Sequence, residues 1–81
     1  MNRNDITAEV NKIFQEIFDD ETLTVTDATS AQDIEDWDSL EQINILVAME
    51  RVFRIKFTVN DITGLENVGQ TISLIERKLA E

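Results

Sequence analysis

The sequence predicts an all-α fold, on three observations. The chain of 81 residues contains no proline and 2 glycines, and these residue types most disfavour a helix interior. Apolar residues recur at helical spacing in separate stretches near the start, the middle and the end of the chain. A chain of this length has room for one thin hydrophobic core, so we expect residues 1–81 to form a single domain.

The first helix is predicted over about residues 5–18, with Asn4 or Asp5 available as its N-cap. Apolar residues at positions i, i+4, i+7, i+8 and i+11 indicate its buried face, and these are Ile6, Val10, Ile13, Phe14 and Ile17. We therefore expect this helix to be amphipathic and to lie against the core.

The stretch from Asp19 to Trp37 loses the helical period and is rich in threonine, aspartate and serine. We interpret it as a long loop, and loops of this length in compact domains are often functional. The alternation of Leu23 and Val25 also fits a short strand, but no second run of similar character offers it a partner. We favour the loop, with Trp37 as an anchor packed on the helices rather than a residue that stacks on a ligand.

The second helix is predicted from Ser39 to Phe53, with Asp38 or Ser39 as its N-cap. A rotation of about 100° per residue gives it two apolar arcs. The arc suited to the core holds Ile45, Leu46, Met49, Val52 and Phe53, together with Gln42, whose place there the sequence does not explain. The opposite arc holds Leu40, Ile43, Val47 and Ala48, interspersed with Asn44 and Arg51. Either the helix is buried on nearly all sides or the second arc is a docking patch, and we favour the patch.

A short element follows, in which Thr58 and Asp61 have the spacing of a cap and Gly64 marks the end. The last helix is predicted to begin near Asn67, whose side chain can cap it while Gln70 reaches back. Its buried stripe is predicted to consist of Val68, Ile72, Ile75 and Leu79. The predicted order is therefore helix, long loop, helix, short element, helix.

Missing residue types exclude several kinds of chemistry. The chain has no cysteine and no histidine, so it has no cysteine nucleophile, no thiolate zinc site and no histidine general base. Its apolar runs are far shorter than a membrane span, and its first residues lack the apolar core of a signal peptide. We therefore expect a soluble, cytoplasmic protein.

The charge is strongly acidic and uneven. The chain has 17 acids and 7 bases, a net charge of −10, and no base lies between Lys12 and Arg51. Such a balance repels nucleic acid and anionic membranes, so we expect neither as a partner, and we expect partners with basic surfaces. A solvated face is the simplest explanation for an acidic run. The acids from Asp33 to Asp38 lack the glycine and the bidentate glutamate of a calcium loop, and we expect no metal site.

Ser39 lies at the N-terminal tip of the second helix, where unpaired N–H groups and the helix dipole favour an attached or bound anion. A phosphate would be well placed there, and a plain capping serine is the alternative. A catalytic serine is disfavoured, because the chain has no histidine to activate it.

The segment Asp38-Ser39-Leu40, at the start of a helix that ends in Glu50-Arg51-Val52-Phe53, resembles the acyl carrier proteins. The resemblance extends from about Ile6 to Leu79, because the preceding acidic loop, the short third element and Asn67-Val68 also match. It implies a four-helix bundle with a long first loop and a short third helix. It also implies a carrier without catalytic activity of its own, in which Ser39 holds 4′-phosphopantetheine, taken from coenzyme A, through a phosphodiester.

By this resemblance, Asp38 assists the magnesium-dependent phosphopantetheinyl transferase that installs the arm, and Leu40 contacts partner enzymes. The other residues expected to bind partners are Asp36, Glu41, Asn44, Val47, Ala48 and Arg51. The carrier is expected to be a monomer that holds acyl groups as thioesters and meets acyl-activating, acyl-transferring or condensing enzymes.

Two departures from the family pattern concern the approach to Ser39 and the face of the second helix. Asp36 and Trp37 precede Asp38, where a glycine is often found at the first of these positions, and Asn44 and Arg51 replace acids on the helix. Both indicate a dedicated pathway, such as one of lipid or polyketide biosynthesis. The alternative function is a non-enzymatic acidic adaptor that docks through the exposed face of the second helix, with Ser39 only as a cap.

Overall fold

The computed structural model describes all 81 residues and contains four α-helices, one short 3₁₀ turn and no strand. The helices are α1 (Arg3–Ile17), α2 (Ser39–Phe53), α3 (Val59–Ile62) and α4 (Val68–Ala80), and the 3₁₀ turn η1 (Ala31–Asp33) lies in the long loop. The predicted all-α class and the order of elements are confirmed. None of the helices combines the length and the apolar character that a membrane span requires.

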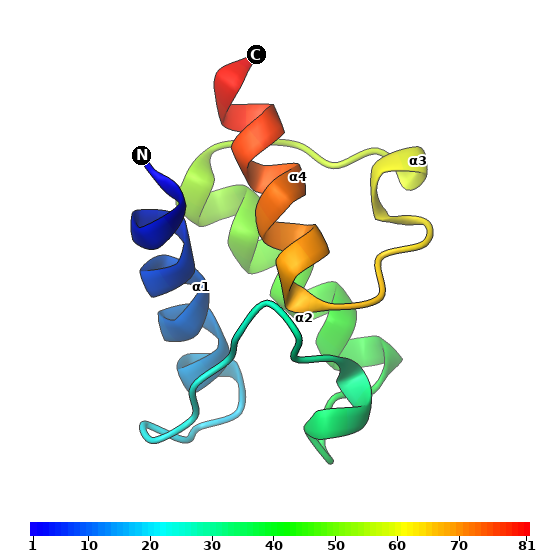
Figure 1. Cartoon of the computed structure of the whole chain (residues 1–81). Helices are drawn as coiled ribbons and strands as arrows, with labels where there is room; N and C mark the ends of the chain where they lie inside the picture. Colours follow the sequence, from blue (N-terminus) through cyan, green and yellow to red (C-terminus); the bar gives the residue numbers. More distant parts are fainter.

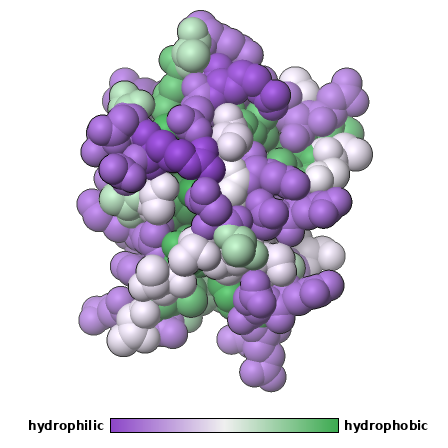
Figure 2. Space-filling model, in the orientation of Figure 1, coloured by the Kyte–Doolittle hydropathy of each residue, from purple (hydrophilic) through white to green (hydrophobic).

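The bundle is organised around α1, which packs against both α2 and α4 (Figure 1). In this view α2 passes behind α4, while the short α3 stands at the edge and is joined to its neighbours by irregular segments. Each long helix buries one apolar face, and the side chains with almost no exposure include Ile6, Val10, Phe14, Ile45, Met49, Ile72 and Ile75. Hydrophilic residues cover most of this face, while residues of intermediate hydropathy lie across its lower centre, where the long loop passes (Figure 2).

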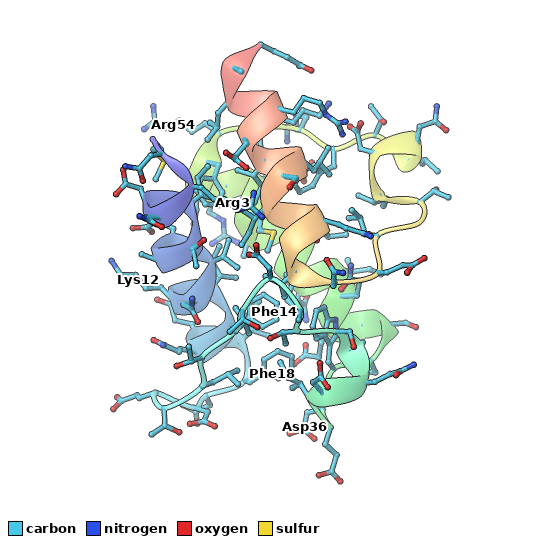
Figure 3. The ribbon with its side chains drawn as sticks, viewed as in Figure 1. Arg3, Lys12, Phe14, Phe18, Asp36 and Arg54 are labelled. Atoms are coloured by element: carbon cyan, nitrogen blue, oxygen red, sulfur yellow. The ribbon has the colours of Figure 1, made fainter.

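α1 begins two residues earlier than predicted, because Asn2 caps it. The Asn2 Oδ1 accepts a hydrogen bond from the Asp5 N–H at 2.9 Å, and the Asp5 carboxylate accepts one from the Asn2 N–H at 3.4 Å. This reciprocal pair satisfies two donors that the helix start leaves free, so the predicted cap at Asn4 or Asp5 is wrong. The added residues bring Arg3 beside α4 (Figure 3), and its guanidinium pairs with Glu76 of α4 and with Asp27 of the long loop.

Side chains of α1 hold the first half of the long loop. The Asn11 Oδ1 accepts a hydrogen bond from the Val25 N–H at 2.7 Å, and the Gln15 Nε2 donates to the Leu23 carbonyl at 3.0 Å. The backbone groups of Leu23 and Val25 are thereby satisfied without a partner strand. The prediction of a loop over this segment is confirmed.

Carbonyl groups in the second half of the loop accept hydrogen bonds from the first N–H groups of α4. The Val68 N–H donates to the Thr29 carbonyl at 2.8 Å, and the Gly69 N–H donates to the Asp27 carbonyl at 2.9 Å. Asn67 is the N-cap as predicted, since its Oδ1 accepts from the Gln70 N–H at 2.8 Å. The Gln70 side chain reaches back to the Glu66 N–H rather than to Asn67. The loop and α4 are therefore joined by backbone hydrogen bonds.

Two side chains predicted to be buried are exposed, and Ile17 of α1, also predicted on a buried face, is only partly buried. Leu79 is 37% exposed because it lies in the last turn of α4, at the margin of the core. Val52 is 47% exposed because it lies on the side of α2 away from the core, next to the buried Phe53. Leu74, in the middle of α4, is buried instead. The remaining predicted core residues of α2 and α4 are buried.

Candidate functional site

Ser39 is the first residue of α2 and Asp38 is its N-cap, so of the two predicted caps the structure selects Asp38. The Asp38 backbone is extended, with φ −107° and ψ −171°, and its Oδ1 accepts a hydrogen bond from the Glu41 N–H at 2.9 Å. Its carbonyl accepts from the Gln42 N–H at 2.9 Å. The Ser39 side chain is exposed and forms no hydrogen bond with the protein, which leaves its hydroxyl free for attachment of a group.

The first turn of α2 offers donors to an anion. Neither the Ser39 N–H nor the Leu40 N–H has an acceptor within the protein, and the positive end of the helix dipole lies at the same place. Asp36 and Asp38, which precede this donor pair in the sequence, are both exposed. No group of three or more acidic side chains converges in a way that would hold a metal ion.

A shallow groove of about 590 Å³ adjoins Ser39. It lies between the start of α2, the end of α3 and the start of α4. Its apolar lining includes Trp37, Ile43, Ile62 and Leu65, and its polar lining includes Glu66, Asn67 and Thr71. A flexible group attached to Ser39 would have an apolar surface within reach.

Trp37 supports one wall of this groove. Its ring meets Phe14 edge-on, with 5.1 Å between ring centroids and an angle of 75°, and its Nε1 donates to the Gln42 Oε1 at 2.7 Å. The prediction of Trp37 as a loop anchor is confirmed. The same hydrogen bond explains why a polar Gln42 lies in the otherwise apolar arc of α2.

The opposite wall depends on how α3 is attached. Thr58 caps α3 and exchanges hydrogen bonds with Asp61, and the Asp61 carboxylate also pairs with the Lys78 Nζ at 2.7 Å. The Lys78 ammonium, together with the Thr58 N–H, lowers the pKa of Asp61 to about 2, and Asp61 raises the pKa of Lys78. One carboxylate thus both begins α3 and ties it to α4.

The outer face of α2 carries most of the residues predicted to bind partners. Leu40 is 66% exposed, Ile43 58% and Val47 48%, and Asn44 and Arg51 are exposed beside them. These values confirm that the second apolar arc faces outward.

Two residues predicted on that face are less available. Ala48 is only partly exposed and packs against the core, because it lies at the margin of the exposed arc. Glu41 is half-buried, and its Oε1 accepts a hydrogen bond from the Asn44 Nδ2 at 2.8 Å.

The groove residues between the end of α3 and the start of α4 were not predicted from the sequence. Ile62, Leu65 and Thr71 follow Ser39 by more than twenty residues, and nothing in their local pattern links them to it. The pair of Asp61 and Lys78 was missed for the same reason. Only the packing of α3 and α4 brings them to the site.

Comparisons with known proteins agree on one family. Over 79 residues, the chain is 33% identical to an acyl carrier protein of Rhodococcus erythropolis, a match that covers 98% of this chain and 87% of that protein. Its fold is similar to the solution structure of a holo acyl carrier protein from Geobacter metallireducens, with a TM-score of 0.85 and 39% identity. That match covers 91% of this chain and 85% of the other. No family model matches the sequence.

Proposed function

We propose that this chain, which belongs to the acyl carrier protein family, carries its phosphopantetheine on Ser39. Members of this family are carriers without catalytic activity, and their cofactor is a covalently attached 4′-phosphopantetheine. The observation that supports Ser39 is its exposed hydroxyl, which is free of hydrogen bonds at the first turn of α2.

The surroundings of Ser39 fit a phosphodiester. The free N–H groups of Ser39 and Leu40 lie where the phosphate would be attached, and donors at a helix start stabilise an anion. The cap formed by Asp38 fixes the first turn, so the hydroxyl is presented on an ordered helix end rather than on a loose loop. The bound arm supplies a terminal thiol that forms thioesters, a chemistry that a chain without cysteine lacks.

The groove beside Ser39 is suited to shelter part of the arm or a small attached acyl group. Its walls come from three elements, and the pair of Asp61 and Lys78 holds the α3 wall in place. Residues 1–81 would act as one carrier domain that delivers acyl groups within a dedicated biosynthetic pathway. The approach through Asp36 and Trp37, together with Asn44 and Arg51 on α2, supports a dedicated pathway.

Loading by a transferase tests this proposal. The apo chain is incubated with coenzyme A and a broad-specificity phosphopantetheinyl transferase, and its intact mass is measured. The wild-type chain should gain one phosphopantetheine, and Ser39→Ala should gain none. Because the Ser39 hydroxyl forms no hydrogen bond, this variant should keep its stability within about 0.5 kcal/mol.

Ser73→Ala serves as the control for loading, because Ser73 is an exposed serine on α4 whose hydroxyl already accepts a hydrogen bond from the Arg3 guanidinium at 3.2 Å, and its replacement should not affect loading. Loading of the Ser39 variant at another serine would refute the assignment. If the folded wild-type chain takes up no phosphopantetheine, the adaptor function becomes the better explanation.

A further inference from the structure

The C-terminal end of α2 carries positive charge that no other part of the protein neutralises. Three of the seven bases form ion pairs, and they are Arg3, Lys12 and Lys78. Arg51, Arg54 and Lys56 are exposed and form none. Glu50 is the only acid among residues 50–56, and its carboxylate accepts a hydrogen bond from the Phe57 N–H at 2.8 Å. A local charge of +2 therefore stands out in a chain of net charge −10.

Arg51 continues the exposed apolar face of α2, and Arg54 and Lys56 follow directly after the end of this helix. Ile43, Val47 and Arg51 are spaced four residues apart, so they lie on one side of the helix. The acids nearest the other end of this face are Asp36, Asp38 and Glu41, and residues 31–41 contain five acids and no base. Figure 3 places Asp36 and Arg54 at opposite ends of the molecule. At a rise of about 1.5 Å per residue, Glu41 and Arg51 are separated by about 15 Å along the axis.

We propose that the enzymes that meet this carrier along the outer face of α2 carry charges of both signs, with opposite signs at the two ends of the docking surface. This inference rests on the proposed function, since it takes Ser39 as the reacting end. The partner surface has basic groups around the entrance that receives the arm from Ser39. It has an apolar centre for Leu40, Ile43 and Val47, and acidic groups about 15–20 Å away that meet Arg51 and Arg54. A uniformly basic partner surface would repel Arg51 and Arg54 at the C-terminal end of α2.

Other occupants of this face fit the charges less well. A second copy would bring another net charge of −10, and one helix face is small beside the roughly 800 Å² per partner of a stable interface. An anionic membrane would attract Arg51, Arg54 and Lys56 but repel the acids at the other end of the same face.

Opposite charges at the two ends of the α2 face fix the direction in which a partner docks. A face with one sign of charge fits a partner in either direction, whereas a face with opposite signs at its ends fits in one direction only. Docking in that direction places Ser39 over the entrance each time. We therefore expect the cations to act in recognition and not in the chemistry of transfer.

Reversing the charge of Arg51 or Arg54 tests the proposal, because kcat/KM should fall if the partner is acidic there and rise if it is basic. The chain is first loaded with phosphopantetheine and checked by mass, so that a failure of attachment at Ser39 is detected separately. Acylation of this holo chain by the acyl-loading enzyme of its own organism is then measured as kcat/KM at low salt. Arg51→Glu and Arg54→Glu should each lower kcat/KM at least about fivefold through KM, with kcat unchanged. Asp36→Lys should lower it as well, and the effects should fade at about 0.5 M salt.

Arg77→Glu is the matched control, because Arg77 is an exposed base on α4 with no ion pair and the same change of charge. It should leave kcat/KM within about twofold. If Arg51→Glu accelerates acylation or has no effect, the partner is uniformly basic and the proposal is wrong. Binding to anionic vesicles that depends on Arg51 and Arg54, or dimerisation that depends on them, would likewise overturn it.

Discussion

Replacing Gly69 by alanine tests how the long loop is held against α4. Gly69 is buried in the first turn of α4, and its N–H donates to the Asp27 carbonyl at 2.9 Å. A Cβ at this position would lie 2.8 Å from the Asp27 oxygen, 2.9 Å from the Asp27 Cβ and 3.1 Å from the Asp27 Cα. Since two of these atoms belong to the backbone, a change of side-chain rotamer cannot relieve the contact, and the loop must move.

The expected loss can be estimated from three contributions. Alanine is favoured over glycine in a helix by about 1 kcal/mol, which stabilises the variant. Overpacking against a fixed neighbour costs about 1–3 kcal/mol. Movement of the loop also weakens the hydrogen bonds of Val68 with Thr29 and of Gly69 with Asp27, each worth about 0.5–1.5 kcal/mol. Together these contributions give a net destabilisation of about 1–5 kcal/mol, and each 1 kcal/mol lowers Tm by about 4–8 °C in a domain of this size.

Urea and thermal unfolding followed by circular dichroism measure this loss, and amide hydrogen exchange locates it. Protection of the amides at positions 68 and 69 should fall in Gly69→Ala. Gly64→Ala is the control, because its added methyl meets no atom within 4 Å and its cost is backbone strain at φ +86° alone. That variant should leave the two amides protected. A Gly69→Ala protein as stable as the wild type would show that the loop does not press on α4.

Two further predictions concern charge. Added salt or millimolar magnesium should raise Tm at neutral pH, because residues 1–41 carry all of the net −10 and screening weakens their mutual repulsion. Salt also weakens the surface ion pairs, but each of these is worth at most about 1 kcal/mol. Coincident melting curves would refute this. Because the pKa of Asp61 is lowered to about 2, its stabilising effect is complete above the unfolded pKa of 3.8 and is lost as the pH falls towards 2. Lys78→Met should therefore lose less stability than the wild type between pH 5 and pH 2.5, measured by urea unfolding, and equal losses would contradict the role of the pair.

The caps and faces of the helices follow from local sequence. Asn67 and the pair of Thr58 and Asp61 were predicted as caps because the side chain and the amide that it binds are three residues apart. The outward face of α2 was predicted because a period of 3.6 residues fixes which side chains share a side. The choice between Asp38 and Ser39 as cap was not predictable, since both residue types cap well and the backbone angles decide.

The groove beside Ser39 and the attachment of the long loop to α4 both depend on contacts between residues that are distant in the sequence. Ser39 and Ile62 share a groove only because α3 is tied to α4, and Gly69 meets Asp27 only because the loop returns across the start of α4. Sequence by itself determined the helices and the exposed stripe of α2, because these depend on neighbours within one or two helical turns. The tertiary structure decided which amides of α4 donate to carbonyls of the long loop, and which residues lie around Ser39. These contacts depend on how whole helices pack.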